Sequence, residues 1–246
     1  MNTLHGKTAL VTGGSRGIGA AIVRALAGQD AQVAFSYNTS AERAGTLANE
    51  LTAAGGRVKA YRADATGLEH LPALVDEVFQ DFGNLHILVN NAGIFIGGTV
   101  GEIPLEDYRR IMTINVDAVF VLTQAAVKVM QTDARIINIG SVLGERASVP
   151  GIGIYNASKF AVAGFTRSWA KDLGPRGILV NAIQPGPIDT ELNPADGANA
   201  DHMRGLTALG RYGRAEEIAS VAAFLAGPGA SYLTGATINV DGGWNA

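Results

Sequence analysis

The chain has 246 residues, of which 47% are hydrophobic and 17% are charged, and its formal net charge is −3. It has no cysteine and only four histidines, far apart in the sequence, which excludes disulfides, a thiol nucleophile and a cysteine- or histidine-built metal site. Because we see no basic run, no leader and no apolar stretch long enough to span a bilayer, we expect a cytoplasmic protein with neither a nucleic-acid nor a membrane partner.

Short apolar runs alternate with longer helical patterns along the whole chain. Strands are predicted at residues 8–12, 32–37, 57–62, 87–89, 135–139, 178–183 and 236–240. Helices are predicted at residues 18–27, 41–54, 68–82, 105–130, 155–173 and 215–226. Continuously apolar strands separated by helices are typical of a parallel sheet covered on both faces. We therefore expect a doubly wound, seven-stranded, Rossmann-like α/β fold in one domain, residues 1–246.

One segment, at about residues 187–212, departs from this alternation. It is polar and rich in glycine, asparagine, aspartate and alanine. Compact domains rarely carry such a long segment unless it is a lid or a binding loop, so we expect a substrate loop here, with disorder as the alternative.

A glycine-rich turn follows the first predicted strand and opens a helix. It reads Thr12-Gly13-Gly14-Ser15-Arg16-Gly17-Ile18-Gly19. Glycines let a backbone approach a pyrophosphate closely, and a helix N-terminus supplies free N–H groups. The G-x-x-x-G-x-G spacing differs from the ordinary Rossmann fingerprint, but its place after the first strand predicts a dinucleotide site. The predicted contacts are Gly13, Ser15, Arg16, Gly17, Ile18 and Gly19.

The end of the second strand indicates which dinucleotide is bound. A NAD site usually has an acid there for the ribose hydroxyls, whereas this stretch has none, and Glu42 is interpreted as the capping-box partner of Thr39. Arg16 offers a cation for a ribose 2′-phosphate, assisted by Asn38 and Ser40. NADP(H) is therefore favoured over NAD(H). The alternative for Arg16 is a solvated side chain or a pair with a surface carboxylate.

Tyr155 and Lys159 stand four residues apart, so on a helix they share a face. A phenol is a poor acid or base at neutral pH, and a nearby ammonium favours its ionised form. Together with Ser141 and the glycine-rich turn, this pair indicates an acid/base site that acts on one small volume.

In this order and spacing the motifs resemble those of the short-chain dehydrogenase/reductases, in their single-domain branch. The resemblance covers the whole chain and also rests on Asn90-Asn91-Ala92-Gly93, Asn115 and Pro185-Gly186. Two departures stand out. The loop between Ser141 and Tyr155 is longer by a residue, and His86 replaces an aspartate, which puts a local turn contact in doubt.

The resemblance implies a role for each of four residues. Tyr155 would be the acid in carbonyl reduction and the base in alcohol oxidation. Lys159 would lower the pKa of Tyr155 and bind the nicotinamide ribose. Ser141 would stabilise the substrate oxygen, and Asn115 would hold a water in a proton relay.

The resemblance also implies further cofactor contacts. Asp64 would contact the adenine, with Ala65 beside it, and residues Asn91, Ala92 and Gly93 would line the adenine ribose. The nicotinamide contacts would follow the sixth strand, at Pro185, Gly186, Ile188 and Thr190.

These observations favour an NADPH-dependent carbonyl reductase acting on a small ketone or aldehyde. The motifs are also similar to those of 3-oxoacyl-carrier-protein reductases, but an acidic carrier protein requires a basic patch at the site mouth. Acids balance the arginines of the substrate loop: Arg204, Arg211 and Arg214 stand against Asp189, Glu191, Asp196 and Asp201. A nucleotide-binding regulatory protein without turnover is the alternative from another class.

Apolar side chains on two predicted helices indicate a subunit contact, and the resemblance implies a homotetramer. They are Val116, Val119, Phe120 and Thr123 on one helix, and Ala161, Phe165 and Trp169 on the other. The segment 239–244 is likewise too apolar and glycine-rich for a free tail.

Overall fold

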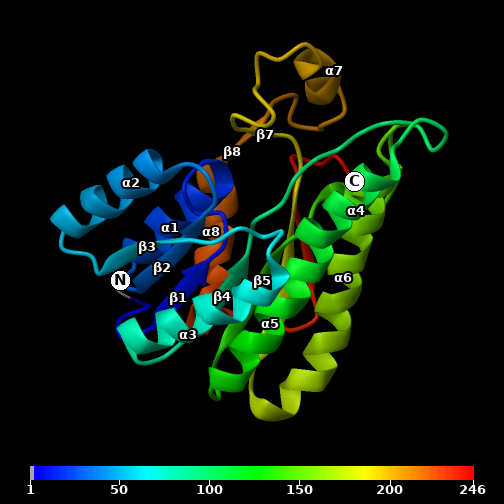
Figure 1. Ribbon diagram of the computed structural model, residues 1–246. Helices are drawn as coiled ribbons and strands as arrows, with labels where there is room; N and C mark the ends of the chain where they lie inside the picture. The colour runs from blue at the N-terminus through cyan, green and yellow to red at the C-terminus, as the bar shows by residue number, and fades with distance from the viewer. Residues whose placement is uncertain (1–2) are drawn as a thin grey trace.

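The computed structural model describes residues 3–246, which form a seven-stranded β-sheet with helices on both faces (Figure 1). The strands are β1 (Thr8–Val11), β2 (Gln32–Tyr37), β3 (Val58–Arg62), β4 (Ile87–Asn90), β5 (Arg135–Ile139), β6 (Leu179–Pro185) and β9 (Thr237–Val240). They lie in the order β3-β2-β1-β4-β5-β6-β9, and all neighbours are parallel. The predicted fold class is confirmed.

Helices cover the two faces of the sheet as separate layers (Figure 1). One layer contains α1 (Gly17–Ala27), α2 (Ala41–Ala53) and α8 (Ala215–Ala226). The other contains α3 (Leu71–Phe82), α4 (Leu105–Met112), α5 (Ala118–Val129) and α6 (Gly153–Leu173). Single 3₁₀ turns lie at η1 (Leu68–His70), η3 (Val142–Gly144), η4 (Gly174–Arg176) and η5 (Pro228–Ala230).

The central strands β1, β4 and β5 read as mostly apolar because they are buried from both sides, whereas the edge strands β3 and β9 are partly exposed. All four residues of β1 are buried, and they alternate between two cores. Ala9 and Val11 pack with α1 and α8, whereas Leu10 packs with α3 and α5. In α1 the fully buried Ile22 and Leu26 stand one turn apart, and each contributes about 1.5–3 kcal/mol by leaving water.

The strand order reverses between β1 and β4. From β1 the chain continues to β2 and β3 on one side, and it then returns to β4 on the other. In open parallel sheets the crevice beyond the carboxyl ends of the strands, at this reversal, is where ligands bind.

His86, in the turn before β4, makes the contact that its replacement of aspartate put in doubt. Its Nδ1 accepts a hydrogen bond from the backbone N–H of Thr8 at 2.9 Å. Burial lowers the pKa of this imidazole, which keeps the accepting nitrogen free of a proton.

The helix predicted at residues 105–130 is continuous but not uniformly α-helical. Between α4 and α5 lies a π-helical turn, η2 (Thr113–Asp117), which carries Asn115. By length and composition alone the run Leu105–Val129 could cross a membrane, since its most apolar 18-residue window has a mean hydropathy of 1.3. Within the fold, however, α5 packs on the sheet and on α3.

Several residues predicted to form a subunit contact are instead internal. Val116, Val119 and Thr123 are buried in their own chain, and so is Trp244. Phe120 is 43% exposed and lies beside the stacked pair of Phe165 and Trp169, whose ring centroids are 4.6 Å apart. The exposed apolar surface is therefore narrower than the sequence predicts.

The segment predicted as a substrate loop has structure of its own. It contains β7 (Ile188–Asp189), the short helix α7 (Ala200–Gly205) and β8 (Gly213–Arg214). β7 and β8 pair in parallel as a separate two-stranded sheet. Figure 1 shows the segment projecting beyond the carboxyl ends of the main strands.

Candidate active site

The glycine-rich turn between β1 and α1 requires its glycines. Gly13 and Gly17 have φ values of 64° and 52°, in the left-handed region that favours glycine. A Cβ atom on Gly19 would lie 2.3 Å from the carbonyl oxygen of Gly13, so a side chain there would break the turn. Arg16 is the N-cap of α1 and makes no side-chain cap bond, which leaves the first N–H groups for a ligand.

Side chains from β1 and β4 hold this turn in place. The Thr12 hydroxyl accepts hydrogen bonds from the N–H groups of Asn91 and Ala92, each at 2.9 Å. In return the Asn91 amide donates to the carbonyls of Thr12, at 2.8 Å, and Gly13, at 3.2 Å. The turn is thus tied to the neighbouring strand before any ligand arrives.

Asn90 supports the sheet instead of lining the turn. Its amide donates to Thr123 at 3.1 Å and to Asn138 at 2.9 Å, and Asn138 donates onward to Thr166 at 2.9 Å. All four side chains are buried, so this chain of hydrogen bonds joins β4 and β5 to α5 and α6.

The adenine end of the site follows β2 and β3. The Asp64 carboxylate accepts hydrogen bonds from the backbone and side chain of Thr66, and these bonds hold the pKa of Asp64 below its usual range. The predicted capping box of Thr39 and Glu42 is wrong: Ser40 is the N-cap of α2, and no side chain caps that helix. No acid takes the place at the end of β2, as predicted.

Arg16 is not free in this structure. Its Nη1 lies 3.7 Å from the carboxylate of Glu191, and Arg43 donates a short hydrogen bond to the same carboxylate. Arg43 was not among the predicted site residues. Only the fold brings it near Glu191, since 148 positions separate the two residues in the sequence.

Tyr155, Lys159 and Ser141 meet at the carboxyl end of β5. Tyr155 and Lys159 share a face of α6, and the Lys159 ammonium lies 5.7 Å from the centre of the Tyr155 ring. The ammonium donates to the carbonyl oxygen of Ile139, the last residue of β5, at 3.0 Å. Ser141 is two residues further on and hydrogen-bonds with Tyr155.

Burial sets the charge state of this group. Desolvation raises the pKa of Tyr155, against the opposing effect of the Ser141 hydrogen bond. Desolvation also lowers the pKa of Lys159 to about 8. In this structure the Lys159 ammonium donates to Ile139, and desolvation has the larger effect on Tyr155. That Lys159 lowers the pKa of Tyr155 stays a prediction.

A buried glutamine fixes Ser141. The Oε1 of Gln184, on β6, accepts from the Ser141 N–H at 2.5 Å, and a Cβ atom on Gly140 would lie 2.1 Å from the same oxygen. The Ser141 hydroxyl also accepts from the N–H of Leu143 at 3.2 Å. The contact of the Ser141 N–H with Gln184 and that of the Ser141 hydroxyl with Leu143 together orient this hydroxyl in the site.

Asn115 lies behind the site and not on its wall. Its amide donates to the Ile94 carbonyl at 2.9 Å and to the Ser158 hydroxyl at 3.1 Å, and its Oδ1 accepts from the Ile94 N–H at 2.8 Å. Gly93 separates it from Lys159, since a Cβ atom there would lie 3.2 Å from the Asn115 Oδ1 and 3.6 Å from the Lys159 ammonium. In this structure the side chain joins η2, the chain after β4, and α6.

One cavity of about 750 Å³ brings the remaining predicted residues together. Its walls include Tyr155, Lys159 and Ser141, and every residue predicted to bind the cofactor. They are Gly13, Ser15, Arg16, Gly17, Ile18, Gly19, Asn38, Ser40, Asp64, Ala65, Asn91, Ala92, Gly93, Tyr155, Lys159, Pro185, Gly186, Ile188 and Thr190. The volume and the free helix N-terminus fit a dinucleotide.

Sequence reasoning missed the apolar wall of the same cavity. It includes Phe95, Leu143, Leu192, Met203 and Trp244. Phe95 is 57% exposed, and its ring meets that of Tyr155 edge-on, with centroids 5.1 Å apart. The only signal in the sequence was that of apolar residues within loops, which by itself does not show which cavity they line.

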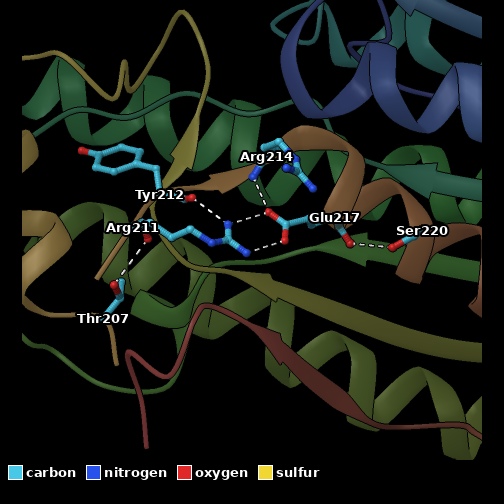
Figure 2. A network of polar contacts seen from close by, with 6 residues as sticks. All are labelled: Thr207, Arg211, Tyr212, Arg214, Glu217 and Ser220. Atoms are coloured by element: carbon cyan, nitrogen blue, oxygen red, sulfur yellow. Dashed lines mark hydrogen bonds and ion pairs between the residues drawn. The ribbon is translucent and has the colours of Figure 1, made fainter. Parts of the chain in front are cut away.

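Two arginines of the substrate loop, Arg204 and Arg211, are engaged in ion pairs. Figure 2 shows Arg211 forming two hydrogen bonds with Glu217 of α8, at 2.9 and 2.7 Å, while Glu217 also accepts from the backbone N–H of Arg214 at 2.7 Å. These contacts, that of Arg211 first, hold the pKa of Glu217 at about 2. Arg204 pairs with Asp201 at 2.5 Å.

Comparison with known proteins places this site in a family. The model described as enoyl-(acyl carrier protein) reductase matches residues 13–245. A cyclic-di-GMP-binding biofilm dispersal mediator protein of Escherichia coli K12 is 43% identical over 246 residues, covering 100% of both chains. A 3-oxoacyl-[acyl-carrier-protein] reductase of Synechocystis is 40% identical over 246 residues, covering 99% of this chain and 98% of the relative.

A solved structure agrees in fold and cofactor class. A short-chain dehydrogenase of Burkholderia cenocepacia in complex with NADP is 46% identical, covers 99% of this chain and 100% of its own, and superposes with a TM-score of 0.98. Its ligand agrees with the cofactor that the turn of the present chain predicts. From the family match, the full-length relatives and this structural agreement, the chain belongs to the short-chain dehydrogenase/reductase family of oxidoreductases.

Proposed function

We propose that this protein is an NADPH-dependent carbonyl reductase that transfers hydride between the nicotinamide and a small ketone or aldehyde, or the corresponding alcohol. One observation supports the proposal above all others. Tyr155, Lys159 and Ser141 face the same cavity as the phosphate-binding turn, so acid, oxygen-binding group and cofactor site meet in one place.

The proton for the new alcohol comes from Tyr155. A bound nicotinamide supplies the hydride in reduction and accepts it in oxidation. Because the pKa of Tyr155 is raised, its phenol holds a proton at neutral pH, which suits an acid in the reductive direction. Oxidation needs the ionised phenol and should therefore be favoured at alkaline pH.

Ser141 assists this proton transfer at the substrate, and Lys159 assists it at the cofactor. The Ser141 hydroxyl is held by its own backbone contacts and can donate to the substrate oxygen where negative charge develops. The Lys159 ammonium is available to the cofactor ribose once it turns from the Ile139 carbonyl. Asn115 fixes the chain at Ile94 and acts as a positioning residue.

A small freestanding carbonyl compound is favoured over an acyl chain presented by a carrier protein. The inner wall is apolar, formed by Phe95, Leu143 and Met203 among others, and suits an alkyl or aryl substituent. Arg211 and Arg204 are neutralised by acids of this chain, which weakens the basic patch that an acidic carrier protein would need. The Synechocystis relative keeps the carrier-protein substrate as the second candidate.

A substrate panel tests this choice. NADPH consumption should be measured with small alkyl and aryl ketones, with aldehydes, and with a 3-oxoacyl thioester both free and on acyl carrier protein. We expect turnover of the free ketones, with no gain when the thioester is attached to the carrier protein. A strong preference for the carrier-bound substrate would replace the proposal with its alternative.

A regulatory, non-catalytic nucleotide-binding role is the candidate from another class. The name of the Escherichia coli relative supports considering it. A complete set of Ser141, Tyr155 and Lys159 would be superfluous in such a protein. Calorimetric titration with cyclic di-GMP, beside the turnover assay, decides: tight cyclic-di-GMP binding without turnover of any carbonyl compound would favour the regulatory role.

We also propose a homotetramer located in the cytoplasm. The support in the structure is limited to the exposed Phe120 on α5 and the partly buried Phe165 and Trp169 beside it on α6. Light scattering at micromolar concentration tests it, and a stable monomer would contradict it.

A further inference from the structure

A single carboxylate lies between two guanidinium groups at the outer end of the cofactor cavity. Each oxygen of Glu191 faces one arginine: Oε1 accepts from Arg43, and Oε2 lies 3.7 Å from Arg16. Arg16 begins α1 and Arg43 lies in the first turn of α2. Three separate segments of the chain therefore meet at this anion.

A tight turn presents Glu191 to the arginines. Asn193 donates its backbone N–H to the Thr190 carbonyl at 3.0 Å, and Asp189 accepts from the N–H of Ala195 at 2.9 Å. At the tip of this turn Leu192 lines the main cavity, as does Glu191. The position of Glu191 is thus fixed by the backbone as well as by its ion pairs.

The surroundings of this carboxylate are those of a phosphate site. An outer pocket of about 400 Å³ continues from the cofactor cavity and shares Ser15, Arg16 and Glu191 with it, while Arg43 lines the outer part. Guanidinium groups bind carboxylates and phosphates through the same fork of N–H donors. Another anion could bind both arginines only if it displaced the Glu191 carboxylate.

We propose that Arg43 is a second guanidinium for the ribose 2′-phosphate of NADPH, and that Glu191 is an internal anion which this phosphate displaces. The two residues would then set the preference for NADPH over NADH. The inference rests on the proposed NADPH cofactor and adds the residues that select it.

The charges determine whether each residue strengthens or weakens the binding of each cofactor. NADH has a hydroxyl in place of the phosphate, so Glu191 stays on its arginines and neither residue affects NADH. NADPH must compete with Glu191, and the repulsion between the carboxylate and the phosphate opposes binding. Glu191 carries this competing charge at neutral pH, as an ordinary glutamate does, and the Arg43 hydrogen bond lowers its pKa further.

Fluorescence titration of NADPH and NADH against four variants tests the proposal. Arg43→Gln should weaken NADPH about tenfold, the loss of one charge-assisted contact, and leave NADH unchanged. Glu191→Gln should tighten NADPH about three- to tenfold, again without effect on NADH, and the gain should shrink as salt is added. Thermal melts confirm that each variant is folded.

Two matched controls come from the same outer pocket. Arg24 lines it but pairs with Glu50, and Glu42 lines it without contacting Glu191. Arg24→Gln and Glu42→Gln should leave the affinity for NADPH within about twofold of the wild type, as expected for exposed charges outside a direct contact.

Four results would overturn the proposal. Two concern the arginines: an equal loss of affinity for NADPH and NADH in Arg43→Gln, or a loss of NADPH affinity in Arg24→Gln as large as that in Arg43→Gln. Two concern the acids: a gain of NADPH affinity in Glu42→Gln as large as that in Glu191→Gln, or weaker NADPH binding in Glu191→Gln. A wild-type protein that binds neither dinucleotide would instead overturn the proposed function. If the wild type binds NADPH and the variants give any of the four results, this inference fails but the proposed function stays intact.

Discussion

The two ends of the cofactor cavity are built in opposite ways. At the catalytic end Lys159, Ser141 and Asn115 are each at most 7% exposed, and backbone carbonyls, amides and a buried glutamine hold them. At the outer end Arg16, Arg43 and Glu191 have side chains about half exposed, held by one another's charge. We therefore expect the chemistry at the end where geometry is costly to change, and cofactor choice at the end where a single substitution can change it.

The largest effect should come from the catalytic end. Replacing Tyr155 with Phe keeps the ring against Phe95 and removes the proton that the substrate oxygen needs. We expect kcat to fall at least about 10²-fold, the lower end for a positioned acid, with NADPH affinity nearly intact. Steady-state kinetics and a fluorescence titration measure the two quantities. A variant with a third of wild-type turnover would show that Tyr155 is not the acid.

The buried Lys159 at the catalytic end should make the stability of the fold depend on pH. Its pKa in the fold is about 8, against 10.5 as the ordinary value, so the fold binds this proton less well than the unfolded chain does. The buried charge destabilises the fold below pH 8, and that penalty is relieved as the pH rises from 8 to 10.5.

A Lys159→Met variant has no such proton to lose. Between these pH values the free energy of unfolding of the cofactor-free wild type should therefore rise by about 3 kcal/mol relative to the variant. Denaturant unfolding at several pH values measures the difference. Parallel pH profiles for the two proteins would contradict a desolvated ammonium.

Replacing Arg16 should affect the binding of NADPH more than that of NADH, as expected of a residue at the outer end of the cavity. Replacing it with Ala removes a charge-assisted contact to the 2′-phosphate, which should weaken NADPH by roughly 10–150-fold. NADH, which carries no such phosphate, should be affected much less. Equal weakening of both cofactors in a titration would mean that Arg16 serves the turn and does not read the phosphate.

The smallest effect should come from the ion pair of the substrate loop. Arg211 and Glu217 form two hydrogen bonds but lie partly in water. Exposed pairs contribute about 1 kcal/mol or less, so Arg211→Ala should lower the free energy of unfolding by no more than that. A loss of several kcal/mol in chemical denaturation would place this pair with the buried contacts instead.

Most of the fold follows from the sequence because each buried strand reads as an uninterrupted apolar run. β2 and β5 match their predicted bounds at both ends, and other strands differ by one or two residues. The predicted cofactor residues gather in one cavity for a topological reason. They follow the carboxyl ends of parallel strands, which meet at one edge of the sheet whatever their separation in the chain.

What the sequence did not indicate depends on contacts between distant segments. Glu191 meets Arg43 only in the folded chain, across 148 positions of sequence. Trp244 joins the cavity wall because β9 runs parallel to β6 and ends at the same edge of the sheet. The capping box of Thr39 failed because the local pattern fits more than one start of the helix. Local chemistry alone could not place these side chains.

The π-helical turn at Thr113–Asp117 makes the length of this segment critical. Adding one residue here would turn α5 by about 100° relative to α4, since each α-helical residue advances the chain by that angle. Val119 and Leu122 would then leave the core, and Phe120 would be driven towards it. Residues 99–101, exposed and without a helix to keep in register, should accept a change of length that 113–117 cannot. Chain length, as much as residue identity, is therefore under constraint in this helix.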